Sequence, residues 1–349
     1  MNRKITKTIR VRGVPIGGGN PIPVQSMTNT HTDDVAATLA QLRRLEAAGC
    51  EIVRLAVPNQ LAARALPEIR RGTDLPLVAD IHFDYRLALA AVEAGFDKIR
   101  INPGNIGSPE RVRMVADACR DHGVPIRVGV NSGSVEKGLL EKYGLCAKSL
   151  CESALGHVKL LEDCGFEDIC ISVKASDVAM TVEANRLLST LCDYPLHIGV
   201  TEAGTKERGI LKSAAGIGAL LLDGIGDTIR ISLTDAPEEE AHAGGELLRA
   251  LGLRSGVQFV SCPSCGRTEY DLIGTAKAVE TRLRDKPWNI TVAVMGCVVN
   301  GPGEASHADY GIAGGKSEGV IFKYGEPVAR VASDRLADAL VELIERENQ

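Results

Sequence analysis

Aromatic side chains are scarce in this sequence. Only 3% of its 349 residues are aromatic, and tryptophan occurs once. So few rings argue against a surface on which successive nucleotide bases stack. The core must instead be filled by Ala, Val, Leu and Ile, which suit closely packed helices and parallel strands.

An excess of positive charge is also missing. The chain has 45 acidic and 40 basic residues, with a formal net charge of -5 at pH 7. No general positive field is therefore available to hold nucleic acid or an anionic membrane surface. Any basic residues that bind a ligand must act locally.

Long apolar runs are absent as well. The segment 1–13 alternates charged and β-branched residues, unlike a secretion signal, and no later stretch is long enough to span a membrane. We therefore expect a cytoplasmic chain whose ten cysteines are mostly reduced thiols. Seven of them lack metal-ligand spacing and are interpreted as small buried hydrophobic residues: Cys50, Cys119, Cys146, Cys151, Cys164, Cys170 and Cys192.

The first two thirds of the chain alternate short apolar runs with amphipathic helical segments. The runs begin near residues 22, 51, 77, 98, 126, 168, 196 and 228. Their mean spacing of about 29 residues is typical of a strand followed by a helix and two loops. We predict an α/β fold, a TIM (β/α)8 barrel, over residues 1–251.

A weak internal repeat supports the barrel. Segments 49–54, 95–100 and 165–170 share a pattern that returns, displaced by one position, in 226–230. These are alternate strands, and alternate strands contribute to the same interior layer, which places Arg54, Arg100 and Arg230 at one height about the axis. Residues 133–144 fill the longest gap and are expected to form an extended loop over the mouth.

The pattern changes after residue 251. A joint over 252–256 leads to a small α+β domain over 257–349, with strands at 257–260 and 290–294, a helix near 270–284, a hairpin within 322–331 and a final helix from Ser333. Segment 311–316 resembles a phosphate-binding loop but lacks the full pattern, so we interpret it as an ordinary loop.

Polar residues end most of the barrel strands, at the face where barrel enzymes carry their active sites. They are Gln25, Ser26, Arg54, Asp80, His82, Arg100, Asn102, Arg127, Asn131, Ser172, Lys174, Thr201, Glu202, Arg230 and Ser232.

The cations in this set predict an anionic ligand. The arginines could simply pair with Asp80, Asp97 and Glu202. However, two guanidiniums about 8 Å apart repel by about 2 kcal/mol at a dielectric constant of about 20. Two or three carboxylates cannot offset that repulsion among five cations, whereas forked guanidinium donors match the oxygens of a diphosphate.

Other roles are open for single residues at the mouth. Lys174 is a candidate for a Schiff base, although phosphate binding explains its cationic neighbours better. Glu202 is better placed as a proton donor. His82 and His197 are expected to be structural hydrogen-bonding residues.

Three cysteines in the second domain have the spacing of metal ligands. Cys262 and Cys265 lie on one turn, and Cys297 follows the next predicted strand. His307 would complete a zinc site, whereas Glu304 offers an oxygen ligand to a 4Fe-4S cluster. Spacing alone leaves both metals open, together with three free thiols.

Four segments together resemble one enzyme family. Segments 23–29, 201–204, 262–266 and 295–304 are similar to those of the 4-hydroxy-3-methylbut-2-enyl diphosphate synthases of the non-mevalonate isoprenoid pathway, and the likeness covers essentially the whole chain. The resemblance implies a barrel followed by a 4Fe-4S domain. It also implies conversion of 2-C-methyl-D-erythritol 2,4-cyclodiphosphate with two electrons from ferredoxin or flavodoxin.

The resemblance also assigns roles to residues. It implies that Cys262, Cys265, Cys297 and Glu304 hold the cluster, that Glu304 can be displaced by substrate, and that Glu202 is the acid. It assigns the diphosphate to Arg54, Arg100, Asn102, Arg127, Asn131, Lys174, Arg230 and Ser232. The rival interpretations are a pteroate-synthase-like transferase with a structural zinc domain and a non-enzymatic iron-sulfur carrier.

Chain order predicts a shared active site. The last barrel helix, near 238–251, returns to the face opposite the mouth, and the joint that follows reaches at most about 20 Å. A barrel roughly 30 Å tall is too large for its own cluster domain to reach around it. We expect a homodimer in which each cluster domain completes the partner's barrel.

Overall fold

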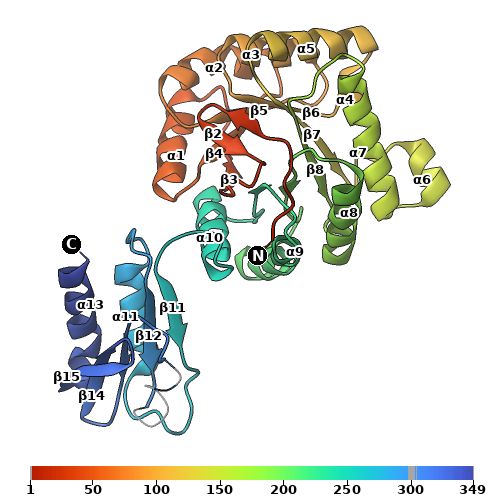
Figure 1. The fold of residues 1–349 in the computed structure, drawn as a ribbon. Helices are drawn as coiled ribbons and strands as arrows, with labels where there is room; N and C mark the ends of the chain where they lie inside the picture. The colour runs from red at the N-terminus through yellow and green to blue at the C-terminus, as the bar shows by residue number, and fades with distance from the viewer. Residues whose placement is uncertain (1, 298–302, 304, 349) are drawn as a thin grey trace. The chain divides into compact units, whose positions relative to one another are not determined.

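The computed structural model describes residues 2–297, 303 and 305–348. The chain forms two compact units, Met1–Leu251 and Gly252–Gln349. Each unit has its own core, and they are described separately below (Figure 1).

Eight parallel strands of the first unit form a closed barrel. Neighbours pair from β3 to β8 and from β9 to β10. Bridges between Ile171 and Leu196 and between Val24 and Ile229 close the ring. The strands are β3 (Gln25–Met27), β4 (Ile52–Ala56), β5 (Leu77–Asp80), β6 (Lys98–Ile101), β7 (Ile126–Asn131), β8 (Ile169–Lys174), β9 (His197–Ile198) and β10 (Thr228–Ile229). The predicted TIM barrel is confirmed.

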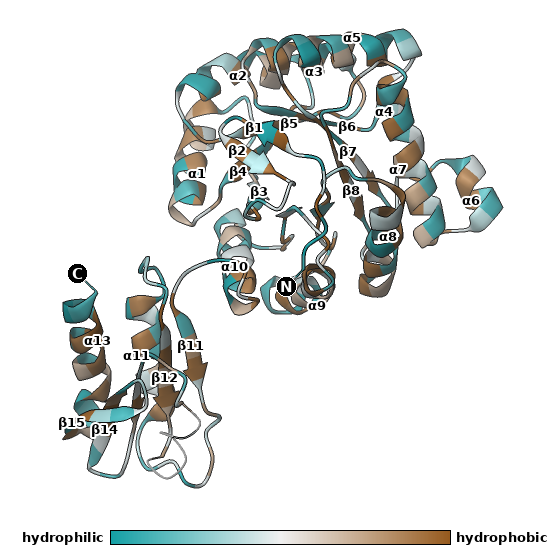
Figure 2. Ribbon diagram, viewed as in Figure 1, coloured by the Kyte–Doolittle hydropathy of each residue, from teal (hydrophilic) through white to brown (hydrophobic). Residues whose placement is uncertain are grey.

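Helices surround this barrel and bury one side each. In α1, Asp34 caps the first turn by accepting from the Ala37 N–H, while Leu42 and Leu45 face the core. Polar and apolar residues alternate around α2, α3 and α5 in Figure 2. The helices are α1 (Val35–Ala47), α2 (Gln60–Arg71), α3 (Tyr85–Glu93), α4 (Pro103–Ile106), α5 (Pro109–Asp121), α6 (Lys137–Tyr143), α7 (Ala147–Glu162), α8 (Val178–Leu191), α9 (Lys206–Leu222) and α10 (Pro237–Ala250).

Two features of this unit differ from expectation. An antiparallel hairpin of β1 (Ile9–Val11) and β2 (Val14–Ile16) precedes the barrel. It packs on Ile52 and Val78, near the amino ends of β4 and β5, and so closes the end of the barrel opposite the mouth. The segment expected to be an extended loop is half helical, because it contains α6.

In its described residues, the second unit has a five-stranded mixed sheet and the two α-helices α11 and α13. Its strand order is β11-β12-β13-β14-β15, with parallel pairs up to β13 and antiparallel pairs after it. Its elements are β11 (Gln258–Ser261), α11 (Leu272–Leu283), β12 (Thr291–Met295), β13 (Tyr310–Ala313), β14 (Glu318–Lys323), β15 (Glu326–Ala332), a 3-10 turn (Ser333–Arg335) and α13 (Leu336–Glu347).

One interpretation for this unit was wrong. Segment 311–316 is not simply a loop, since its first residues belong to β13, a central strand of the sheet. Gly311 is required there because a Cβ would overlap the Phe322 ring on β14. Within the described part of the chain, no helix is both long and apolar enough to cross a bilayer.

Candidate active site

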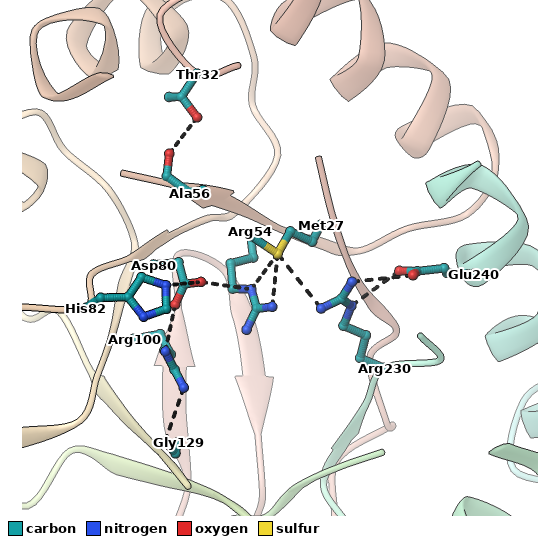
Figure 3. Close-up of polar contacts among 10 residues, drawn as sticks. All are labelled: Met27, Thr32, Arg54, Ala56, Asp80, His82, Arg100, Gly129, Arg230 and Glu240. Carbon is teal, nitrogen blue, oxygen red and sulfur yellow. Dashed lines mark hydrogen bonds and ion pairs between the residues drawn. The ribbon is translucent and has the colours of Figure 1, made fainter. Parts of the chain in front are cut away.

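Asp80 organises one side of the barrel mouth. Its Oδ1 lies 3.2 Å from Arg100 Nη1, and its Oδ2 lies 3.9 Å from Arg54 Nε and 3.6 Å from His82 Nε2 (Figure 3). Burial would raise the pKa of Asp80, but Arg54, His82 and Arg100 together lower it below the usual range. Asp80 therefore stays ionised and holds two guanidiniums in place.

A second carboxylate, missed in the sequence, holds Arg230. Glu240 on α10 lies 3.2 Å from Arg230 Nε and accepts a hydrogen bond from Ser26 Oγ at 2.8 Å. The alternative considered from the sequence paired the arginines with Glu202 and Asp97 as well as with Asp80. Asp97 instead pairs with Arg70 and Arg12. Sequence spacing could not find Glu240, because it lies on a helix rather than at a strand end.

Met27 lies between two of the arginines. Its sulfur accepts contacts from Arg54 Nε at 3.0 Å and Nη2 at 2.9 Å, and Arg230 Nη1 lies 3.8 Å away (Figure 3). Burial lowers the pKa of Arg54 to about 10, as do the charges of Arg230 and Arg100, while Asp80 opposes them. Arg54 and Arg230 thus share the mouth despite coming from distant parts of the chain.

Two further cations have no carboxylate partner. Within the described residues, neither Arg127 nor Lys174 forms an ion pair, and the Nε and Nη1 of buried Arg127 have no hydrogen-bond partner. Burial lowers the pKa of both side chains, and neighbouring arginines add to the effect. Five cations therefore gather where Asp80 and Glu240 are the carboxylates that pair with them.

Buried polar groups that were not predicted from the sequence continue into the barrel interior. Lys98 and Gln25 are fully buried, and their side-chain nitrogens have no protein partner among the residues described. His197 was expected to be a structural hydrogen-bonding residue, yet both its ring nitrogens also lack partners there. Burial lowers the pKa of His197, as do Lys174 and Arg127.

Two asparagines offer neutral donors beside the cations. Asn102 is 3% exposed, and both polar atoms of its side chain lack partners within the described chain. Asn131 Oδ1 accepts from the Gly133 N–H at 3.1 Å, which leaves its amide nitrogen as a donor. Amide donors in these positions suit the oxygens of an anion.

Glycines on two strands make room for the cations. A Cβ on Gly129 would lie 2.7 Å from Arg100 Nε, and Arg100 Nη2 donates to the Gly129 carbonyl at 3.1 Å. A Cβ on Gly199 would lie 2.6 Å from Lys174 Nζ. Both glycines are visible in the sequence, but only the fold shows that the side chains of Arg100 and Lys174 lie against them.

Glu202 and Ser232 lie on the loops that follow β9 and β10. Glu202 is exposed and has a positive φ of 52°, a conformation uncommon for a residue other than glycine. Ser232 is half-buried. Neither is drawn into the ion pairs formed by Asp80 and Glu240.

The predicted thiolate ligands follow the carboxyl ends of two paired strands. Cys262 and Cys265 follow β11, and Cys297 follows β12, its parallel neighbour. Cys262 Sγ accepts a hydrogen bond from the Gly296 N–H at 2.9 Å. Backbone hydrogen bonding from Arg267 lowers the pKa of Cys265. Such N–H···S bonds favour thiolates over thiols.

Among the residues described, no group of three His, Cys, Asp or Glu side chains is placed to hold a metal ion. Glu304 lies outside the described residues. His307, the candidate fourth zinc ligand, is exposed.

Comparison with known families accounts for both units. Residues 6–245 match the GcpE TIM-barrel domain, and residues 258–346 match the GcpE protein C-terminal domain. The chain belongs to the GcpE family. The resemblance seen in the sequence is thereby confirmed, and so is the order of a barrel followed by a mixed α/β domain.

Relatives of this GcpE chain match it over nearly their full length. A protein of Fusobacterium nucleatum is 56% identical over 97% of this chain and 96% of its own. One from Geobacter sulfurreducens is 57% identical over 98% of this chain and 97% of its own. Both are named 4-hydroxy-3-methylbut-2-en-1-yl diphosphate synthase (flavodoxin).

Solved structures share the barrel of this GcpE chain at low sequence identity. Dihydropteroate synthase of Burkholderia cenocepacia is 17% identical with a TM-score of 0.50, over 71% of this chain and 99% of its own. N-acetylneuraminic acid synthetase of Leptospira borgpetersenii is 12% identical with a TM-score of 0.50, over 72% of this chain and 92% of its own. These likenesses show the fold alone.

Proposed function

We propose that this chain opens 2-C-methyl-D-erythritol 2,4-cyclodiphosphate reductively and releases 4-hydroxy-3-methylbut-2-enyl diphosphate. The carrying observation is the barrel mouth, where Arg127 and Lys174 add positive charge that neither Asp80 nor Glu240 offsets. A diphosphate would supply the missing negative charge. The names of the near-full-length relatives support the same product.

The barrel residues bind and orient the diphosphate. Arg54, Arg100 and Arg230 are held by carboxylates, so their remaining N–H donors face the ligand in fixed directions. Asn102 and Asn131 add neutral donors, and Ser232 adds a hydroxyl. Charge grows on the phosphate oxygen as the ring opens, so fixed cations stabilise the transition state more than the bound substrate.

The second domain would hold a 4Fe-4S cluster through Cys262, Cys265 and Cys297, with Glu304 as the fourth ligand. The N–H···S bond to Cys262 and the lowered pKa of Cys265 fit thiolate ligands, and exposed His307 gives no support to zinc. A bound cluster would supply single electrons at low potential, and the oxygen ligand Glu304 would be easier for substrate to displace than a thiolate.

Glu202 would hold the proton for the departing hydroxyl, which leaves as water. Its carboxylate is exposed on a mouth loop, and its positive φ is a strained conformation of the kind often found at functional sites. Flavodoxin would deliver the two electrons, since the relatives carry that word in their names. Ferredoxin is the other donor that the sequence resemblance implies.

The site would be completed by a second copy of the chain. Helix α10 runs from the mouth side of β10 back toward the amino ends of the strands, and β11 begins at Gln258 only eight residues after α10 ends at Ala250. This short connection supports a homodimer in which the cluster of one chain serves the barrel of the other.

Anaerobic turnover tests the proposed function. Purified protein should be brown, contain iron and sulfide, and convert the cyclodiphosphate when a strong one-electron reductant is supplied. Colourless protein with stoichiometric zinc would favour the transferase. A brown protein that binds no cyclodiphosphate would favour an iron-sulfur carrier.

A further inference from the structure

Asn102 occupies a helix cap without acting as one. It is the N-cap residue of α4, where asparagine normally accepts a hydrogen bond from a backbone N–H of the first turn. Its side chain makes no such bond, and within the described chain both of its polar atoms are buried without partners. Something else must therefore satisfy the first turn of α4.

His157 on α7 takes over that task. The Gly104 N–H, in the first turn of α4, donates to His157 Nδ1 at 3.1 Å. The imidazole can approach so closely because Gly104 has no Cβ, and a Cβ there would overlap the ring. Burial lowers the pKa of His157, with Glu136 opposing, so the ring is neutral and Nδ1 can accept.

The other ring nitrogen reaches the neighbouring mouth loop. Because Nδ1 accepts, the proton of the neutral ring is on Nε2, which lies 2.8 Å from Glu136 Oε1 but not in hydrogen-bond geometry. Glu136 precedes α6 on the loop that begins with Asn131. His157 thus lies beside both loops that carry the asparagines of the mouth.

We propose that His157 is a positioning residue for substrate binding. By capping α4 in place of Asn102, it leaves the Asn102 amide free to bind the diphosphate. Without His157, the Asn102 side chain would turn back to cap the Gly104 N–H and leave the mouth. This inference rests on the proposed function, because it assumes an anionic ligand there.

The test compares His157→Ala, His157→Asn, Asn102→Ala and the double variant Asn102→Ala/His157→Ala. Affinity for inorganic diphosphate is measured by calorimetry, and KM and kcat for the cyclodiphosphate are measured anaerobically. We expect His157→Ala to weaken diphosphate binding and raise KM by about tenfold, with kcat changed less than KM. His157→Asn retains an acceptor near the Nδ1 position and should recover most of the affinity.

The double variant separates positioning from general destabilisation. If His157 acts through Asn102, removing His157 should cost little more once Asn102 is already alanine. Equal losses from His157→Ala with and without Asn102, or no loss in either background, would overturn the inference.

Gly104→Ala provides a second route if His157→Ala folds poorly. The added Cβ should displace the His157 ring and weaken diphosphate binding, whereas Gly138→Ala, with nothing within 4 Å, should not. Equal affinity in these two variants would also overturn the inference. Wild-type protein that neither binds diphosphate nor turns over the cyclodiphosphate would instead contradict the proposed function.

Discussion

Lys98 is a buried residue whose charge is costly to the folded barrel. Lys98 is fully buried, its Nζ has no protein partner among the described residues, and burial lowers its pKa to about 7. The unfolded chain, in which lysine titrates near its ordinary pKa of about 10.4, therefore binds more protons above pH 7 than the native state does. The contribution of Lys98 to the free energy of unfolding is lowest below pH 7 and rises up to about pH 10.

Lys98→Met is therefore expected to stabilise the ligand-free protein. The free energy of unfolding should increase by a few kcal/mol at about pH 6, and the gain should shrink as the pH approaches about 10. Urea unfolding at several pH values measures this, with Lys137→Met, an exposed lysine on α6, as the control. A gain that does not vary with pH would contradict the assignment of the titration to Lys98.

At the scale of elements, the glycine that follows β9 makes room for the Lys174 side chain from β8 and for the backbone that follows β10. Gly199 follows β9, and a Cβ there would overlap the Arg230 carbonyl and approach Lys174 Nζ to 2.6 Å. The missing side chain lets Lys174 cross from β8 into the mouth. Binding of an anion therefore depends on the shape of a neighbouring strand as well as on the cation itself.

Gly199→Ala should displace Lys174 and weaken diphosphate binding by about tenfold or more. The stabilisation that inorganic diphosphate gives in thermal unfolding measures this loss. Gly218→Ala on α9 is the matched control, because nothing lies within 4 Å of a Cβ there, and helix propensity predicts a small gain in stability. An unchanged diphosphate response in Gly199→Ala would refute the role of this contact.

The β1–β2 hairpin is an element that stabilises without touching the mouth. Ile16 is fully buried and packs with Ile52 and Val78 at the opposite end of the barrel. Ile16→Ala should lower the free energy of unfolding by about 2–5 kcal/mol and leave KM for the cyclodiphosphate unchanged. Val14→Ala, at a partly buried position, should cost less. A raised KM in Ile16→Ala would show that the hairpin also shapes the mouth.

At the scale of the whole molecule, the shared site predicts complementation. Arg54→Ala disables a barrel, and Cys297→Ala disables a cluster domain. If the site forms between chains, mixing the two inactive proteins under subunit exchange should restore about a quarter of wild-type activity, because half of the dimers then carry one intact site. Each variant exchanged with itself is the control. No recovery, despite exchange proven by mass, would exclude the shared arrangement.

Much of the architecture followed from the order of residues. The eight strand positions and the change of pattern near residue 252 could be predicted because apolar periodicity reflects burial within each element. The β1–β2 hairpin and β13 were not predicted, because three or four residues are too few to show a hydrophobic period.

The residues of the candidate site also fall into two groups, those that could be predicted from the sequence and those that could not. Arg54, Arg100, Asn102, Arg127, Lys174 and Arg230 could be proposed from the sequence, because residues that end parallel barrel strands must share one face. Their partners could not: Glu240 comes from a helix, Lys98 lies lower in the barrel, and His157 meets Gly104 across 53 residues.

The sequence by itself determined the eightfold alternation of strands and helices, the gathering of cations at one face and the family. Only the tertiary structure decided which cations pair with a carboxylate and which do not. It also decided why the Asn102 side chain does not cap α4. The physical reason is that periodicity is a local property of the chain. Charge balance and hydrogen-bond partners depend instead on distances between residues that only folding brings together.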